Sequence, residues 1–309
     1  MRVYSMRIRV LGSAAGGGFP QWNCDSPRCR EARIGRLASE SRTQSSIAVS
    51  VDGEHWLLVN ASPDIRQQII ANPPLHPRGG VRSSGIAAVL LMDSQLDHVT
   101  GLVSLRESSK PLSVYCSERT DADLRSGLPI LELLEHYCGS HVHHLPLDGS
   151  SIAPAEVPGI RLTPVPLTSK PPPYSPHRDD PRPGDNLGLY IEGEDTDAAV
   201  FYAPGLGVID PHLHNWMARA QVLMVDGTTW TDDELERVVG GTKTARQMGH
   251  LPLTGEDGML ETVAKYPRAR RILIHINNTN PLLDPESAER AELHKRGIEV
   301  AYDGMDIYL

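Results

Sequence analysis

Short apolar runs separated by turn residues dominate the pattern of this chain. Residues 7–11 (RIRVL) alternate like a half-buried strand and then break into a glycine-rich loop, GSAAGGGFP. Residues 43–51 and 55–60 predict a hairpin whose turn is supplied by Asp52-Gly53. Continuous apolar runs, typical of strands buried on both faces, occupy residues 86–92, 200–202, 222–225 and 271–276.

Helical spacing is less frequent than strand patterning. It appears at residues 128–136, 211–220 and 285–296, and a closing strand is predicted at 298–302. Prolines are concentrated in residues 163–183, which predicts either an interdomain linker or a long ordered loop that forms a lid over a site. Because strands outnumber helices and the two are mixed, the pattern favours a layered α/β or α+β fold.

Composition narrows the class of protein. The 309 residues carry a net charge of −9, so nucleic acid is a poor partner. No apolar run approaches the roughly 18 residues that span a bilayer, and the N-terminal ten residues lack the apolar segment of a signal peptide. Four cysteines do not make a disulfide scaffold. We therefore expect a cytoplasmic protein without a membrane partner.

Polar residues able to bind a metal directly follow one predicted strand. After the apolar run 86–92 come Asp93, Gln95, Asp97 and His98. The end of a buried strand can bring such side chains together without disturbing the core, and carboxylate beside imidazole suits a divalent metal. An isolated Asp-His pair is also typical of a capped turn with a surface histidine, so the pair alone leaves both interpretations open.

This stretch is similar to the HxHxDH signature of the metallo-β-lactamase superfamily. Here the pattern reads Asp93-x-Gln95-x-Asp97-His98, so the first two histidines are replaced and the Asp-His pair is kept. Gly205 stands where the superfamily's bridging aspartate is expected. Without those ligands a hydroxide bridging two zinc ions is hard to build. The departures predict a mononuclear site and argue against lactamase-type hydrolysis.

Further ligands are predicted at the ends of two later strands. His275 resembles the superfamily's final histidine, although a core histidine bonded to the backbone would show the same pattern. Asp226 also ends an apolar run, where a plain Asp-Gly turn is the alternative. His250 is either a weaker ligand candidate or a residue that faces the substrate. Two histidines with one or two carboxylates are the ligand set of non-haem Fe(II) proteins.

Ten motifs in one order carry a closer resemblance. They are GSAAGGGFPQWNC (12–24), RTQSSIA (42–48), NASPDIR (60–66), DSQLDHVTGLVSLRE (93–107), PPYSPHR (172–178), PGDNLGL (183–189), FYAPGLG (201–207), VDGTTW (225–230), MGHLPLTG (248–255) and HINNTNPLLD (275–284). The chain resembles the pyrroloquinoline quinone (PQQ) biosynthesis protein B family from about residue 7 to the C-terminus. The resemblance implies a metallo-β-lactamase-like αββα sandwich in a single domain over residues 1–309.

The same resemblance implies an activity. The expected reaction is an iron- and O₂-dependent hydroxylation of the tyrosine ring in a cross-linked Glu–Tyr unit derived from the peptide PqqA. One alternative is a non-catalytic protein that carries PQQ and assists its transport. Another is a related tailoring enzyme that hydroxylates a different aromatic amino acid or peptide. The partners are then a small peptide-derived substrate and O₂, and a homodimer is possible.

The resemblance also implies roles for individual residues. Asp97, His98 and His275 would form the catalytic centre and hold one Fe(II), with Asp226 as a further ligand and His250 as the weaker candidate. Residues expected to contact the substrate are Asp93, Gln95, Arg66, Arg178, His177 and Asn278, of which the two arginines are candidates for bidentate carboxylate contacts. The segment 170–178 is expected to form a lid, and a rigid structural loop is the alternative.

One motif departs from the family pattern. The family usually has a C-x-C-x-x-C cluster that binds a structural zinc, whereas this chain keeps Cys24 and Cys29 and has Ser26 in the middle position. A serine hydroxyl is a poor zinc ligand, so binding by three thiolates is lost. A structural zinc would then need Asp25 or a distant histidine as the replacement ligand, and the alternative is that Cys24 and Cys29 are ordinary reduced thiols. The histidine-rich residues 141–144 have metal-like spacing but lie between a predicted helix and a turn, so we expect no metal role for them.

Overall fold

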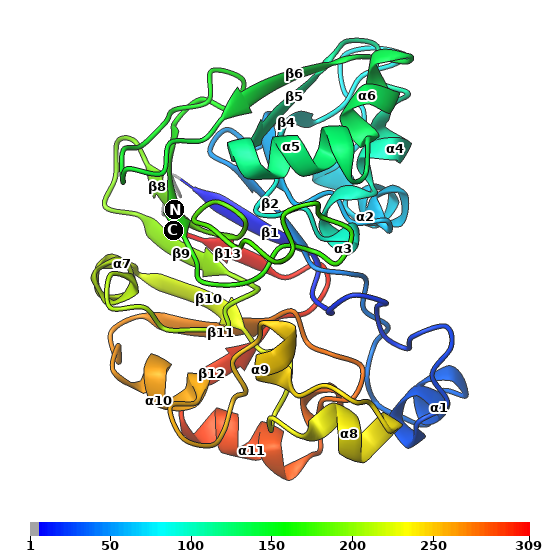
Figure 1. Cartoon of the computed structure of the whole chain (residues 1–309), viewed down its shortest axis with the longest axis vertical. Helices are drawn as coiled ribbons and strands as arrows, with labels where there is room; N and C mark the ends of the chain where they lie inside the picture. Colours follow the sequence, from blue (N-terminus) through cyan, green and yellow to red (C-terminus); the bar gives the residue numbers. More distant parts are fainter. Residues whose placement is uncertain (1–5) are drawn as a thin grey trace.

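Two β-sheets lie face to face in the computed structural model, which describes residues 6–309 (Figure 1). The first sheet has the strand order β13 (Asp306–Tyr308), β1 (Arg7–Gly12), β2 (Ser46–Ser50), β3 (Trp56–Val59), β4 (Ile86–Leu90), β5 (Leu112–Cys116) and β6 (Ser140–His144). The second has the order β12 (Ile298–Val300), β11 (Arg270–Ile274), β10 (Val222–Asp226), β9 (Ala199–Ala203), β8 (Leu187–Gly193) and β7 (Ile160–Pro166). Residues 1–5, which belong to the N-terminal segment without a signal-peptide pattern, lie outside the described residues.

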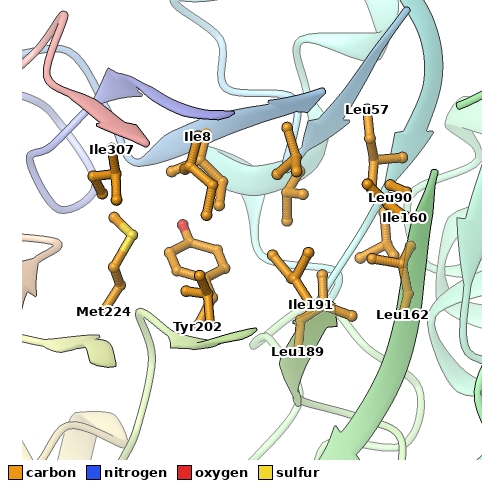
Figure 2. Packing of buried hydrophobic residues seen from close by; sticks show 14 of the residues in the cluster. Ile8, Leu57, Leu90, Ile160, Leu162, Leu189, Ile191, Tyr202, Met224 and Ile307 are labelled. Carbon is orange, nitrogen blue, oxygen red and sulfur yellow. The ribbon is translucent and has the colours of Figure 1, made fainter. Parts of the chain in front are cut away.

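The main core fills the space between the two sheets. Ile8 and Ile307 point inward from the first sheet and face Tyr202 and Met224 of the second (Figure 2). All four side chains are fully buried. Burying an aliphatic side chain of this size stabilises a fold by about 1.5–3 kcal/mol, so the inward-facing residues hold the sheets together.

Helices cover the outer face of each sheet (Figure 1). The outer face of the first sheet packs against α2 (Ile65–Ala71), α5 (Glu118–Ser126) and α6 (Ile130–Glu135). The outer face of the second packs against α7 (Leu213–Arg219), α10 (Met259–Ala264) and α11 (Ala288–Lys295). Shorter helices are α1 (Pro27–Arg33), α3 (Leu96–Val99), α4 (Leu102–Leu105), α8 (Glu234–Val239), α9 (Ala245–Met248), η1 (Pro73–Leu75) and η2 (Pro281–Leu283). The predicted αββα layering is confirmed.

Most predicted helices and strands are present, but they are shorter at their ends than predicted. The hairpin is formed by β2 and β3, whose turn contains Gly53 with a positive φ of 74°. Residues 141–144 follow α6 as expected, and they form edge strand β6, which pairs with β5 and was not predicted. The linker interpretation of residues 163–183 is wrong, because its first residues belong to β7, which pairs antiparallel with β8 in the same sheet.

The parallel strands bring three polar segments to one region. In the first sheet β4 lies parallel to β3 and β5, and Asp93 follows its carboxyl end. In the second sheet β10 lies parallel to β9 and β11, so Asp226 and His275 follow neighbouring strand ends. Among the described residues no helix has the length and apolar character needed to cross a membrane.

Candidate metal centre

Asp97, His98 and His275 form one cluster of potential ligands. Each offers a ligand atom that lies within 4.8 Å of those of the other two. Asp97 and His98 are placed by the short helix α3, while His275 follows β11. The Asp97 Oδ2 atom is 3.8 Å from His98 Nε2 and 3.6 Å from His275 Nε2. Both ring nitrogens therefore face the same carboxylate oxygen at distances longer than a hydrogen bond.

His98 is fixed by a second carboxylate behind its ring. The Nδ1 atom of His98 lies 2.7 Å and 2.9 Å from the two carboxylate oxygens of Asp93. His98 is 3% exposed, and its Nε2 atom is buried without a hydrogen-bond partner. Because Asp93 holds the proton on Nδ1, Nε2 is the nitrogen directed at the cluster, and its lone pair becomes available when a metal displaces the second proton.

His275 is held by a tight backbone junction. Its φ of 63° lies in the left-handed region, which a non-glycine residue adopts only when the surroundings enforce it. The next residue, Ile276, donates its N–H to Ser13 O, and Ala15 N–H donates back to Ile276 O, each at 2.9 Å. The glycine-rich loop that follows β1 therefore pairs with the segment that carries this histidine. A Cβ on Gly16 would lie 3.2 Å from Asp97 Oδ2, so the backbone passes close to the cluster.

Thr228 sets the tautomer of His275. Its hydroxyl donates to Asp226 Oδ1 at 2.6 Å and lies 2.8 Å from His275 Nδ1. Since the single hydroxyl hydrogen is used for Asp226, the Nδ1 of His275 must donate to Thr228. The lone pair of His275 is then on Nε2, the atom that faces Asp97.

Asp226, His250 and His275 form a second cluster on the other side of the His275 ring. The rings of His250 and His275 are stacked with their centroids 5.1 Å apart. Asp226 is fully buried and accepts hydrogen bonds from four donors: Leu206 N, Thr228 N, Thr228 Oγ1 and His250 Nδ1. Its carboxylate is saturated, so in this geometry it supports His250 and, through Thr228, His275.

The electrostatics of the first cluster follow from burial and neighbouring charge. Burial lowers the pKa of His98, but the carboxylates of Asp93 and Asp97 outweigh it and raise that pKa to about 9. Burial raises the pKa of Asp97, and the histidines on either side hold it well below its usual range. The cluster thus combines one anionic carboxylate with two imidazoles.

The donor set of the first cluster fits a divalent metal. A buried His98 Nε2 without a hydrogen-bond partner is costly, and a metal ion that displaces the proton from this nitrogen supplies the missing partner. Asp97 and His275 present the remaining ligand atoms at comparable range. Two imidazoles and one carboxylate with room on the fourth side are the ligands of a mononuclear iron or zinc site.

A small cavity of about 210 Å³ opens onto this cluster. Gly205 lines it, and a Cβ at this position would meet no atom within 4 Å. The residue expected to replace a bridging aspartate therefore leaves open space beside the histidines. Gln95, Asn277, His250 and Thr228 contribute to its polar lining.

The other predicted substrate residues are distributed unevenly. Asp93 lines the small cavity, but both of its oxygens are engaged by His98. Arg178 lines a larger neighbouring cavity and donates to the carbonyl of Pro171. Arg66 is exposed on α2, and His177 is half-buried; neither lines the small cavity. Asn278 faces Cys29, with its Nδ2 atom 3.7 Å from the sulfur.

The proline-rich segment is docked on the loop of residues 93–95 that precedes α3, which we call the metal loop. The hydroxyl of Tyr174 donates to Ser94 O, and Ser175 Oγ donates to Asp123 at 2.6 Å. Asp123 is buried and also accepts from Ser94 Oγ at 2.7 Å. These bonds join the segment predicted as a lid to the residues just before α3.

Of the two cysteines of the altered motif, Cys24 precedes α1 and Cys29 lies within it. Cys24 Sγ donates to Ser26 Oγ at 3.2 Å, and Cys29 is fully buried at the first turns of the helix. Burial raises the pKa of Cys24, but hydrogen bonds from Ser26 and Cys29 lower it overall. Among the described residues these thiols do not belong to a group of three or more potential ligands.

Residues 55–276 match the Beta-lactamase superfamily domain. The αββα fold and the strand-end cluster thus define a protein of the β-lactamase superfamily with a candidate metal site. Coenzyme PQQ synthesis protein B of Pseudomonas aeruginosa is 56% identical over 305 residues, covering 98% of this chain and all of the relative. The same-named protein of Methylococcus capsulatus is 53% identical over 304 residues, covering 98% and 100%.

Solved structures agree with these relatives. The Zn²⁺-bound PqqB of Methylobacterium extorquens superposes with a TM-score of 0.89 at 40% identity, covering 98% of this chain and 100% of that one. A diphosphatase of the PhnP family, 18% identical with a TM-score of 0.68, shares the fold. The chain belongs to the coenzyme PQQ synthesis protein B family, and this membership assigns it to PQQ biosynthesis.

One residue of the site could not be predicted from the sequence. Thr228 connects Asp226, His250 and His275 through a single hydroxyl. Its motif, VDGTTW, is one of the ten that carry the family resemblance, but a threonine after an Asp-Gly turn carries no sign of such a role. Only the packing of β10 against β11 brings it to the histidine ring.

Proposed function

We propose that this chain hydroxylates the tyrosine ring of a small, peptide-derived PQQ precursor at a mononuclear iron site. The observation that carries the proposal is the buried His98 Nε2 without a partner, which faces Asp97 beside the Nε2 of His275. The expected precursor is the cross-linked Glu–Tyr unit implied by the family resemblance.

Asp97, His98 and His275 would hold the ion. An Fe(II) ion bound there supplies the redox chemistry by which O₂ is activated for insertion into an aromatic C–H bond. The reaction uses one O₂ with two electrons and two protons from an external reductant. One oxygen atom enters the ring as a hydroxyl group and the other leaves as water.

The chain's own residues orient the ligands and shape the cavity. Asp93 keeps the His98 ring in place through Nδ1, and Thr228 does the same for His275. The open side at Gly205 leaves room for the ring, while the docked Tyr174 segment covers the metal loop and restricts water. His250, held by Asp226 through Nδ1, lines the same cavity and would contact a substrate bound there.

Hydrolysis in the manner of a two-zinc lactamase is less compatible with the site. Asp93 and Gln95 replace two histidines of the superfamily signature, and Gly205 has no carboxylate to bridge a second metal. Asp226, which is the other carboxylate in reach, is already saturated by four donors. These features support a single metal ion.

An anaerobic titration with Fe(II), followed by O₂, ascorbate as reductant and the cross-linked Glu–Tyr substrate, tests the proposal. We expect one iron per chain, substrate-dependent oxygen uptake and a product heavier by one oxygen atom. The His98→Ala variant should lose iron binding and oxygen uptake together, while Lys110→Ala, a change at an exposed residue that lines neither the small nor the larger cavity, should behave as wild type. Oxygen uptake that is absent from the wild-type chain, or unchanged in His98→Ala, would refute the hydroxylase.

A parallel titration with Zn²⁺ separates the hydroxylase from a carrier of the finished quinone. The zinc-loaded chain should bind the substrate without oxygen uptake, because zinc has no redox chemistry. A pure carrier would bind PQQ with the same affinity in the wild-type chain and in His98→Ala. The carrier alternative has no need for the ligand geometry of Asp97, His98 and His275.

A further inference from the structure

A second cavity adjoins the small cavity at the metal cluster. It encloses about 930 Å³, against about 210 Å³ for the small one. Both are lined by Gln95, Ser169, Met248 and Gly249, so these four residues form the junction between them. At the junction Gly249 has a φ of 91°, and a Cβ there would lie 2.6 Å from Ser169 Oγ, so only glycine fits between the two segments. The shared lining makes the large cavity continuous with the small cavity beside the metal cluster.

The large cavity is lined by positive charge. Its cationic side chains are Lys170, Arg178, Arg182, Lys243 and Arg246, and its single acidic side chain is Asp210. The chain as a whole carries a net charge of −9. The wall therefore has a charge opposite to that of the whole protein, and such a local field attracts anions.

Most of these cations have no carboxylate partner. Arg182 pairs with Asp180 at 2.9 Å, but Arg246 donates to the carbonyl of Glu256 and Arg178 to that of Pro171. Lys170 and Lys243 form no hydrogen bond or ion pair through their side chains within residues 6–309, and both are exposed. The Oδ2 atom of Asp210 is buried without a partner, so this carboxylate oxygen neutralises none of them.

Like charges gathered on one wall repel one another, so the arrangement costs energy unless an anion is bound there. Lysine and arginine recognise carboxylate oxygens by charge-assisted hydrogen bonds, and arginine can do so with two parallel bonds. Lys170 lies beside this wall on the segment that contacts the metal loop, because Asn186 Nδ2 donates to its carbonyl at 3.3 Å and Asn186 pairs with Asp93. Asn186 thus links the segment that carries Lys170 to Asp93, which holds His98 of the metal cluster.

We propose that the cationic wall of the large cavity holds the carboxylates of the substrate while its reacting end lies at the metal cluster, with Lys170 and Lys243 as specificity-determining residues. This inference rests on the proposed function, since it names the residues of this chain that recognise the substrate of that same site. A molecule with two or more carboxylates is held by the wall and oriented toward Asp97, His98 and His275. A neutral aromatic molecule of the same size lacks these contacts and binds weakly.

Calorimetric titration with two matched dipeptides tests the assignment. L-glutamyl-L-tyrosine carries two carboxylates, and L-glutaminyl-L-tyrosinamide is of equal size and has none. We expect the dicarboxylate to bind at low ionic strength and the diamide to bind at least about tenfold more weakly, with added salt reducing the difference. In the double variant Lys170→Met/Lys243→Met the dicarboxylate should bind about tenfold more weakly, because two charge contacts are lost.

The control variant is Lys265→Met, which removes an exposed lysine that does not line the cavity. It should bind both dipeptides as the wild-type chain does. Equal affinity of the double variant and the wild type, equal affinity for the two dipeptides, or no dicarboxylate binding to the wild type would each overturn the proposal. Inorganic phosphate that competes as tightly as the dicarboxylate would also overturn it, since the wall would then hold anions without preference for carboxylates.

The readout is binding and not turnover, so this proposal and the hydroxylase can fail separately. A double variant that binds normally while His98→Ala loses oxygen uptake refutes only the charged wall. A wild-type chain without oxygen uptake whose dicarboxylate binding depends on Lys170 and Lys243 refutes only the hydroxylase.

Discussion

The two sides of the His275 ring contain the same residue types in different states. On one side, Asp97 and His98 face the ring at distances beyond a hydrogen bond, and His98 Nε2 has no partner. On the other, Asp226 and His250 are joined at 2.6 Å, and the carboxylate is saturated. A cluster of acids and histidines is prepared for a metal where its lone pairs are unsatisfied, and it supports structure where they are filled.

The largest expected difference between the two sides is in metal affinity. His98→Ala should weaken Fe(II) or Zn²⁺ binding by more than about 100-fold, above the range found for residues that only orient a ligand. His250→Ala should weaken it by about tenfold or less, because its Nδ1 is bonded to Asp226 and not directed at Asp97. Competition with a metal-binding dye measures both. Equal losses in the two variants would contradict the assignment of the sides.

For the stability of the metal-free chain we expect the reverse: a substitution on the Asp226 side should lower the free energy of unfolding more than one on the Asp97 side. Asp226→Asn places an amide N–H₂ among four donors in a fully buried position, so we expect a loss of about 3 kcal/mol in the free energy of unfolding. Asp97→Asn should cost less than this, because the Asp97 carboxylate accepts no hydrogen bond from the ring nitrogens of His98 and His275, which lie 3.8 Å and 3.6 Å from it. Chemical denaturation in the presence of a chelator gives both values. A larger loss for Asp97→Asn would reverse the comparison.

Thr228 connects the two sides, and its hydroxyl can be removed with little change in shape. Thr228→Val should weaken metal binding by about tenfold, because His275 Nδ1 loses the acceptor that fixes its tautomer. Thr228→Ser keeps the hydroxyl and should bind metal like the wild type. A serine variant as weak as the valine variant would show that the methyl group, and not the hydroxyl, is what matters.

The smallest expected effect is the proton balance of metal binding. The folded pKa of His98 is raised to about 9, above the roughly 6.5 of an unfolded histidine. Protonated His98 therefore stabilises the metal-free chain below about pH 6.5, and this contribution is lost as pH rises to about 9. Metal binding at pH 7.5 should release close to one proton from His98, measured by calorimetry in buffers of different ionisation enthalpy. Asp93→Asn should reduce that release, whereas Asn277→Ala should not.

Much of the fold could be predicted because a continuous apolar run in a water-soluble fold must be buried on both faces. The runs at residues 86–92, 222–225 and 271–276 became parallel strands buried between sheet and helices. Residues 141–144 show no such run, since His141 and His143 alternate on an edge strand, where polar residues are tolerated. Strand β7 is similarly hard to recognise, because two prolines lie in it at the edge of its sheet.

The sequence by itself determined the residue types at the strand ends. Asp97, His98, Asp226 and His275 follow apolar runs that must be buried, so their side chains had to lie at the edges of the sheets. Family membership, too, follows from the order of motifs along the chain. These conclusions depend only on the apolar pattern and on which residue stands at each position, so they need no distances between residues that are far apart in the chain.

Only the tertiary structure decided which of these residues share a site and in what state. It placed Asp93 behind His98, linked Asp226 to His275 through Thr228, and brought Lys170 and Lys243 to one wall from segments more than seventy residues apart. Hydrogen-bond saturation and like-charge proximity are properties of atoms a few ångströms apart. A one-dimensional pattern contains no such distances, so the roles of these residues appear only when the chain is folded.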